Sequence, residues 1–290
     1  MRVASWNLWW RYGRWQERRE VVVAELRRAR PDVCGLQEVW TDSEENFSAS
    51  IAEELGMRLA YAPSPAPGRW QRKLGDTSVG VGDAVLSRWP ISERDVRRLP
   101  AGDEPDEGRT VLYARIEAPH GDVPFFVTHL NSAWGQSGLR REQVGKIAGF
   151  VREKGRSGHP PILTGDFNAP PDADEVRCLV GKSSPPVRGF VLADAWDYAR
   201  PLEPGWTWDR RNPHVAATFE PDARIDYVFV GPPGGDGLGQ VLDTELFGTE
   251  PVDGVWASDY FGVLAVLRGR PSCGDRDSVS HGGSTSETGN

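Results

Sequence analysis

Short apolar runs, each about the length of one β-strand, recur from residue 2 to residue 267 of this 290-residue chain. Between several of them lie charged segments with apolar residues at helical spacing, such as residues 16–30, which end before Pro31. Because no linker interrupts the series, we expect one domain over residues 1–268. Residues 269–290 are rich in Gly and Ser without apolar periodicity, and we expect a disordered tail there.

The composition, 38% hydrophobic and 26% charged, is that of a globular, water-soluble protein. No apolar stretch approaches the roughly 20 residues needed to span a bilayer. The N-terminal segment is too short and polar for a signal peptide. The chain has three cysteines, Cys34, Cys178 and Cys273. Because their number is odd and their spacing is not that of a metal site, we interpret them as free thiols and expect a cytoplasmic protein.

The net charge of −8 argues against a broad basic surface for wrapping nucleic acid, although clustered Arg residues are compatible with a local basic groove. Residues 61–82 are rich in Pro and Gly, and we expect a long loop that forms the rim of a substrate cleft. Arg69, Trp70, Arg72 and Lys73 in this loop are suited to gripping a backbone phosphate, to capping a small pocket or to plain exposure.

Polar side chains recur where the apolar runs begin or end. They are Asn7, Glu38, His129, Asp166, Asn168, Asp226 and Asp259. Such residues converge only if the strand ends gather at one edge of the sheets. Carboxylate and amide oxygens gathered there suit a hard cation such as Mg²⁺, whereas an imidazole beside them suits a phosphate oxygen.

The segments that carry these residues stand in the order "SWNLWW", "GLQEVW", "VTHLN", "LTGDFNAPPD", "RIDYVFV" and "SDY". In this order they resemble the endonuclease/exonuclease/phosphatase superfamily, which is deoxyribonuclease-I-like. The "GWTWDRRNPH" segment is similar to a bacterial subgroup of that superfamily. The resemblance implies a four-layer α/β/β/α sandwich, with two mixed β-sheets face to face and helices outside, and the alternating strands and helices fit it.

The resemblance also implies a metal site. Glu38 matches the Mg²⁺-binding Glu, and Asp259 matches the acid of the family's "SDH" motif near the metal. Asn7 supports the metal or the phosphate. Mn²⁺ is a possible substitute for Mg²⁺ in such a site.

Further roles follow from the same resemblance. His129 matches the imidazole that donates to a nonbridging phosphate oxygen, and Asp166 with Asn168 matches the pair that holds the attacking water or leaving group and orients the phosphate. Asp226 matches the carboxylate that hydrogen-bonds the catalytic His. Arg109 matches a position that some members place beside the phosphate, and the alternative is a solvated Arg in an acidic loop.

The chain departs from the family's pattern at Tyr260, where the "SDH" motif has His. That His accepts or holds the proton of the attacking water. An unperturbed Tyr has a pKa near 10, so only about one part in a thousand is phenolate at pH 7. Neighbouring Asp226 and Asp259 would raise this pKa further, whereas a close Mg²⁺ would lower it.

Three explanations of Tyr260 stay open. The first is an engineered or chance His→Tyr change in an ordinary phosphodiesterase or nuclease, whose catalysis is then impaired. The second is a fold redirected to a small-molecule, biosynthetic reaction that uses Tyr260. The third is a pseudoenzyme that binds phosphorylated ligands without turnover. In each case the expected partner is a phosphorylated or anionic substrate, either a small molecule or a nucleic acid.

Overall fold

A computed structural model describes residues 1–102, 106–119, 121–156 and 158–269. The tail expected over residues 269–290 therefore lies outside the described residues apart from its first residue, and so does Cys273. Cys34 and Cys178 are buried free thiols. No helix in the described ranges is long and apolar enough to cross a membrane.

The first sheet contains six strands in the order β11-β12-β1-β2-β4-β3. Their bounds are β1 Arg2–Asn7, β2 Val33–Thr41, β3 Arg58–Pro63, β4 Gly80–Ser87, β11 Val241–Phe247 and β12 Gly262–Leu267. β1 runs parallel to β2, and the other neighbours are antiparallel. Parallel β1 and β2 end at the same edge of this sheet, which places Asn7 and Glu38 near each other.

The second sheet also contains six strands, in the order β5-β6-β7-β8-β10-β9. Their bounds are β5 Ile91–Arg98, β6 Thr110–Ala118, β7 Gly121–His129, β8 Ile162–Asp166, β9 Ala193–Asp194 and β10 Asp226–Val230. Here β7 and β8 are the parallel pair. The register aligns His129 with Asp166, and Asp166 with Asp226 on the other side.

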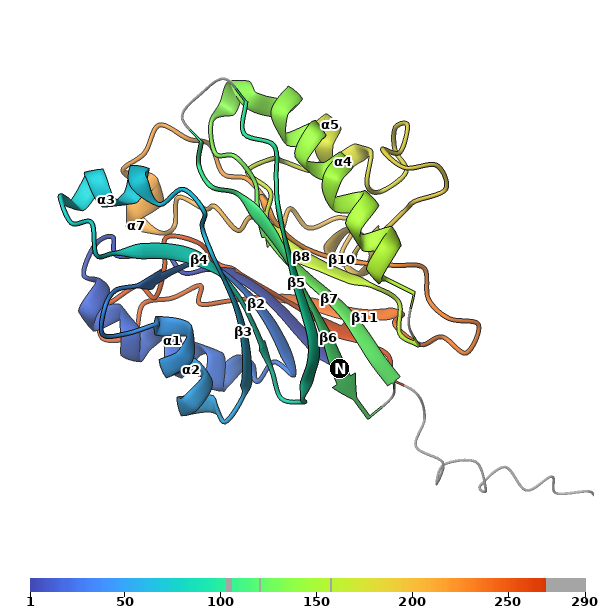
Figure 1. The fold of residues 1–290 in the computed structure, drawn as a ribbon, viewed down its shortest axis with the longest axis horizontal. Helices are drawn as coiled ribbons and strands as arrows, with labels where there is room; N and C mark the ends of the chain where they lie inside the picture. Colours follow the sequence, from blue (N-terminus) through green and yellow to red (C-terminus); the bar gives the residue numbers. More distant parts are fainter. Residues whose placement is uncertain (103–105, 120, 157, 270–290) are drawn as a thin grey trace, which may run out of the picture.

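Helices cover the outer faces of both sheets (Figure 1). Apolar side chains of α1 (Trp15–Ala29) and α2 (Phe47–Leu55) pack on the first sheet, and those of α4 (Ser137–Lys154) and α5 (Asp174–Arg177) pack on the second. The short helices are α3 Gly68–Leu74, η1 Trp134–Gln136, α6 Ala195–Ala199 and α7 Pro213–Ala216. The four-layer α/β/β/α sandwich is thus confirmed.

The inner faces of the two sheets share one apolar core, in which Val3 and Val33 of the first sheet meet Leu112 and Phe125 of the second. The sheets approach closely at Gly35, where an added Cβ atom would lie 2.1 Å from Oγ1 of Thr164. Thr164 is itself fixed by a hydrogen bond of 3.1 Å to the carbonyl oxygen of Phe126. Glycine at this position therefore sets the spacing between the sheets.

The expectation of a loop over residues 61–82 is wrong in part. The segment contains the end of β3, all of α3 and the start of β4. Trp70 anchors α3 because its ring is buried and packs edge-on against Trp10, with the ring centroids 5.0 Å apart. Gly75, with φ of 66°, ends the helix in the left-handed conformation. Pro and Gly marked the turns around this helix and concealed the helix itself.

We expect Gly35→Ala to lower the free energy of unfolding by about 1 to 3 kcal/mol, because the new methyl group must displace Thr164 or separate the sheets. Urea denaturation measures the change. Gly149→Ala is the matched control, since this glycine lies within α4 with no atom near its Cβ position and the change favours the helix. A Gly35→Ala protein as stable as the parent would contradict the close contact between the sheets.

Candidate active site

The polar residues at the strand ends converge at one edge of the sandwich. Nδ2 of Asn7 from the first sheet donates a hydrogen bond of 3.0 Å to Oδ2 of Asp166 in the second. Asn7 is held in turn, because its Oδ1 accepts from the backbone N–H of Trp9 at 2.9 Å. The edge where the two sheets meet therefore brings together side chains that lie far apart in the sequence.

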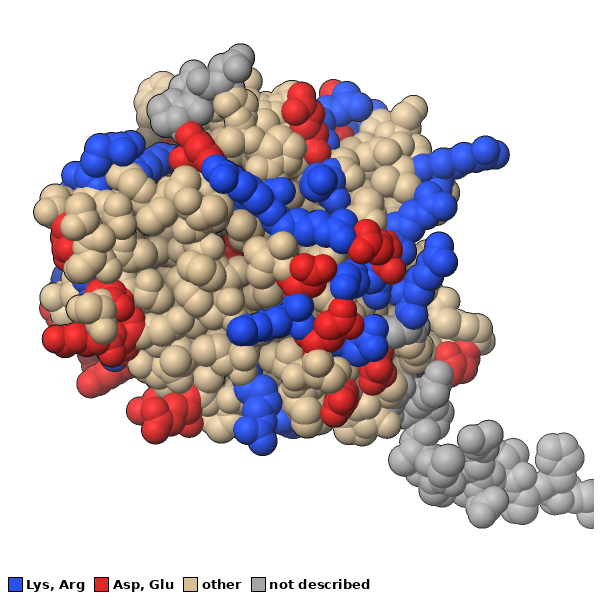
Figure 2. Space-filling view, viewed as in Figure 1, with Lys and Arg blue, Asp and Glu red and all other residues tan. Residues whose placement is uncertain are grey.

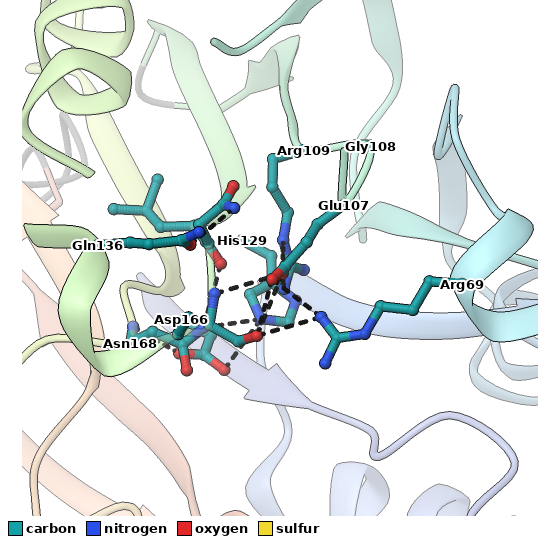
Figure 3. Close-up of polar contacts among 12 residues, drawn as sticks. Arg69, Glu107, Gly108, Arg109, His129, Gln136, Asp166 and Asn168 are labelled. Atoms are coloured by element: carbon teal, nitrogen blue, oxygen red, sulfur yellow. Dashed lines mark hydrogen bonds and ion pairs between the residues drawn. The ribbon is translucent and has the colours of Figure 1, made fainter. Parts of the chain in front are cut away.

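Asp166 is the centre of this group (Figure 3). Its Oδ1 accepts from the backbone N–H of Asn168 at 2.9 Å, and its Oδ2 lies 3.3 Å from Nε2 of His129. Burial raises the pKa of Asp166 to about 6, and hydrogen bonds from Asn168, Asn7 and Tyr260 act in the opposite direction. This carboxyl group is thus fully buried and hydrogen-bonded on several sides.

Asn168 connects His129 to the loop after β8. Its backbone adopts φ of 48°, a conformation for which Asn is one of the more tolerant residues. Its Nδ2 donates to the carbonyl oxygen of Leu130 at 3.1 Å and lies 3.1 Å from Nε2 of His129. Burial lowers the pKa of His129 well below its usual value, and Arg109 and Arg69 lower it further. The imidazole is therefore neutral at pH 7.

Glu38 lies at an irregular point of the first sheet. Its φ is 53°, and the register of β2 against β4 shifts between Leu36 and Val39. This bulge interrupts the alternation of side chains between the two faces of the sheet. The Glu38 side chain lines the cleft described below. Burial raises the pKa of Glu38 to about 7, against the effect of Arg109.

Arg109 belongs to the site and is not a solvated residue of an acidic loop, since it is 7% exposed. Its guanidinium group donates to Glu107, which also accepts from Oγ of Ser132 at 3.0 Å and lies 2.9 Å from Nη1 of Arg69 (Figure 3). Sequence reasoning missed Glu107. Its only signal was its position two residues before Arg109.

Two further buried carboxyl groups lie near this centre. Burial together with Asp166 raises the pKa of Asp226 well above the usual value, against a hydrogen bond from the side chain of Thr207. Asp83, at the centre of β4, was not predicted from the sequence. Burial raises the pKa of Asp83 to about 7, although Arg109 lowers it. Both groups are stable when protonated, or when an added cation compensates their charge.

Asp259 and Tyr260 reach the site from the loop before β12. Oδ1 of Asp259 accepts from Oγ of Ser258 at 3.3 Å. Burial and Glu38 raise the pKa of Asp259 well above its usual value. Burial and Asp166 do the same to the pKa of Tyr260, so this phenol keeps its proton and donates a hydrogen bond to Asp166. The ring of Tyr260 packs against Trp208, with the centroids 4.8 Å apart.

A cleft of about 630 Å³ opens above these groups. Its lining includes Trp9, Tyr12, Glu38, Arg69, Trp70, Lys73, Arg109, Ser132, Trp134, Arg140, Asn168, Pro170, Trp208, Glu220, Pro221, Ala223, Ile225, Asp259 and Tyr260. The expected rim position of the segment around α3 is therefore found, with Arg69, Trp70 and Lys73 among the lining residues.

Arg18 holds the cleft wall that contains Trp9 and Tyr12. Its buried guanidinium group donates to the carbonyl oxygens of both, to those of Leu8 and Trp10, and to that of Ala257 at 2.8 Å. One side chain thus connects this wall to the loop that carries Asp259.

The arrangement of acids fits a divalent cation. Burial raises the pKa of Glu38, Asp83, Asp166, Asp226 and Asp259 alike. Several of these carboxyl groups raise one another's pKa, a repulsion that a bound cation relieves. Among the residues that the structure describes, no three His, Cys, Asp or Glu side chains come together as metal ligands. Mg²⁺ commonly binds through one or two carboxylates and keeps several water ligands, so this donor set suits it.

The sequence model of the Endonuclease/Exonuclease/phosphatase family matches residues 4–259. Among curated proteins, inositol phosphosphingolipids phospholipase C of Schizosaccharomyces pombe is 28% identical over 59% of this chain, and the match covers 42% of that protein. This chain therefore spans less than half of that relative. Sphingomyelinase C of Bacillus cereus is 25% identical over 78% of this chain and 70% of its own length.

Solved structures share the fold. An endonuclease/exonuclease/phosphatase from Beutenbergia cavernae is 25% identical, with a TM-score of 0.69 over 93% of this chain and 72% of that one. TDP2 of D. rerio, complexed with a single-strand DNA product, is 19% identical, with a TM-score of 0.72 over 91% of this chain and 97% of that one. The second likeness concerns the fold alone.

We expect the metal-free protein to lose stability as the pH rises from about 4 to 7, partly because of Asp83. Its pKa of about 7 in the fold lies above the value near 4 of an unfolded Asp. The native state therefore binds more protons than the unfolded chain in this window, and the free energy of unfolding falls as the pH rises. Asp83→Asn removes this contribution. Between pH 4 and pH 8, the variant should therefore lose roughly 2 to 4 kcal/mol less of its free energy of unfolding than the parent does.

Urea denaturation in EDTA at both pH values tests this expectation. Asp174→Asn, which changes an exposed carboxylate of α5, is the control. An equal pH dependence in the Asp83→Asn protein and its parent would contradict the assignment.

Proposed function

This chain belongs to the endonuclease/exonuclease/phosphatase family, and on that premise we propose that it is a Mg²⁺-dependent phosphoester hydrolase of the phosphodiesterase type. The observation that carries the proposal is the group around Asp166, in which two sheets bring buried carboxyl groups, a neutral imidazole and an amide together beneath one cleft. Phosphoester hydrolysis requires such a combination of cation ligands and neutral hydrogen-bond donors.

We assign the metal ligands to Glu38 and Asp259, with Asn7 orienting the group through Asp166. Mg²⁺ bound there would withdraw negative charge from a phosphoryl oxygen. His129 and Asn168 would donate hydrogen bonds to the nonbridging oxygens, and the low pKa of His129 keeps it a neutral donor. Arg109, held by Glu107, would attract the anionic substrate into the cleft.

Tyr260 occupies the position at which the resemblance expects the general-base His. Its raised pKa and its hydrogen bond to Asp166 make it a donor, so it does not take a proton from water at pH 7. The buried carboxyl group of Asp226 agrees with this view, because the family's pattern would pair it with an imidazole, whereas here the Thr207 side chain bonds to it. We therefore propose impaired or altered catalysis, with Asp166 as the remaining proton acceptor beside the attacking water.

One observation favours a second function, a small-molecule reaction that depends on Tyr260. Hydrogen bonds hold Tyr260 at its backbone N–H, its backbone carbonyl oxygen and its hydroxyl group, as expected for a positioned proton donor. A third candidate is a module that binds phosphorylated ligands without turnover. The names of two relatives, a phospholipase C and a sphingomyelinase C, add lipid phosphodiesters to nucleic acids as candidate substrates.

The surface charge does not favour wrapping of long nucleic acids. On the face that Figure 2 shows, acidic side chains lie among the basic ones. Around β5 and α4 they form ion pairs, such as Arg97 with Glu153 and Lys154 with Glu93. A substrate that enters the local cleft suits this surface better than one that spreads over it.

We expect the chain to hydrolyse bis(p-nitrophenyl) phosphate in Mg²⁺ and to stop when EDTA is added. Glu38→Gln keeps the size of the side chain but removes the charge that holds the cation, so the rate should fall by about 10² or more. Release of p-nitrophenol measures the rate. Glu54→Gln, at an exposed position of α2, should leave it unchanged. Full activity in EDTA would contradict the metal-dependent mechanism.

We expect Tyr260→His to raise the hydrolysis rate at least tenfold, since general bases contribute about 10² to 10⁴ in rate. Steady-state kinetics on plain DNA, abasic DNA, phosphoinositides and aryl phosphodiesters measure it. No gain on any of these would overturn the proposed defect. Loss of an observed activity in Tyr260→Phe would instead support the reaction that depends on the phenol.

A further inference from the structure

We propose that the cleft contains a subsite for a flat ring carried by the phosphorylated substrate, and that Tyr260 and Trp208 form its wall. The inference rests on the proposed function, because it places the ring beside the phosphate-binding group. It assigns Tyr260 a second role, in which its ring supplies a binding surface at the position where the family resemblance expects a base.

The wall contains a small apolar cluster, and Tyr260 packs both against this cluster and against the apolar core that contains Trp6. Trp208, Val215 and Ile225 are buried in the small cluster, and Ala223 and Tyr260 pack against it. Except for Val215, these residues also line the cleft. The wall therefore presents apolar surface within the cleft that contains Glu38, Asn168 and Asp259.

The ring of Tyr260 is held in a fixed orientation. Its backbone N–H donates to Oγ of Ser258 at 3.1 Å, and its carbonyl oxygen accepts from Nε1 of Trp6 at 3.0 Å. The hydroxyl group is bound to Asp166, and the ring packs at 58° to that of Trp208. Because the hydroxyl group is already engaged, the part of Tyr260 offered to a ligand is its ring, and a fixed ring loses little entropy on binding.

The rest of the lining favours a flat ring over an acyl chain. The lining of the cleft includes six aromatic residues, Trp9, Tyr12, Trp70, Trp134, Trp208 and Tyr260, and four smaller apolar ones, Pro170, Pro221, Ala223 and Ile225. Aromatic faces stack on flat rings with about 1 to 3 kcal/mol per ring, largely independently of the identity of the ring. An acyl chain gains no such preference from them. The volume of about 630 Å³ suits a ligand the size of a nucleotide.

The basic side chains of the cleft make a quaternary ammonium group a less favoured occupant than an anionic one. Nζ of Lys73 lies 4.1 Å from the centre of the Tyr12 ring, on the aromatic face that such a group would need. Arg69 and Arg109 also line the cleft. A substrate with anionic phosphate and an uncharged ring matches this pattern, and both aryl esters and nucleotides have this chemistry.

Binding to the full chain in Mg²⁺, measured by calorimetry, tests the subsite without requiring turnover. Inorganic phosphate, phenyl phosphate and hexyl phosphate form one series, and ribose 5-phosphate and adenosine 5′-monophosphate form another. We expect each ring-bearing ligand to bind at least fivefold more tightly than its partner without the ring, the lower bound of the stacking energy. Preference for phenyl phosphate alone would indicate an aryl ester, and preference for the nucleotide alone a nucleobase.

Variants separate the ring of Tyr260 from its hydroxyl group. Tyr260→Phe should keep the preference for ring-bearing ligands over their partners without the ring, whereas Tyr260→Ala should lose most of it. Trp206→Ala is the matched control, since this half-exposed Trp lies two residues before Trp208 and outside the cleft lining. Near-ultraviolet circular dichroism verifies that each variant is folded.

The outcomes are distinct. In one outcome, inorganic phosphate binds but the ring-bearing ligands bind no more tightly than it does. In another, hexyl phosphate has the affinity of phenyl phosphate, and ribose 5-phosphate has that of the nucleotide. Either outcome would contradict the subsite and leave the proposed function in place. If no phosphate binds, the proposed function fails and the subsite fails with it. If Tyr260→Ala does not fold, the comparison of ligands on the parent protein still decides the question.

Discussion

The hydrogen bond from Asn7 to Asp166 joins the two sheets at the edge where the cleft opens, and the site depends on it. Asp166 receives it while fully buried, and the same carboxyl group contacts Asn168, His129 and Tyr260. A buried carboxyl group with this many partners has one allowed position. The relative placement of the sheets therefore sets the positions of the imidazole, the amide and the phenol at once.

The second constraint is an excess of buried acid. Glu38, Asp83, Asp166, Asp226 and Asp259 all have raised pKa values because burial disfavours their charge. Buried guanidinium groups offset part of it, and one of them, Arg109, is itself paired with Glu107. These buried carboxyl groups lower the stability of the fold at neutral pH, and perturbed groups of this kind are common at functional sites. The same acids keep Tyr260 protonated, so the electrostatics and the identity of residue 260 act together.

Prediction from the sequence succeeded where a segment is defined by its own residues. The segment of residues 16–30, with apolar residues at helical spacing and Pro31 after it, forms α1, which ends at Ala29. It failed where a distant contact decides. The helix of α3 forms because Trp70 packs against Trp10 from the start of the chain. The edge strand β5 alternates exposed and half-buried residues without an apolar run, so it gave no strong strand signal.

The sequence by itself determined the layered α/β fold and a set of polar residues at strand ends, because the periods of apolar residues and the ordered motifs are local properties. Only the tertiary structure decided that Arg109 is buried beside Glu107, that Asp83 joins the acids and that Asp226 is buried near Asp166. Burial and long-range electrostatics set these properties, and both depend on which strands become neighbours across the two sheets.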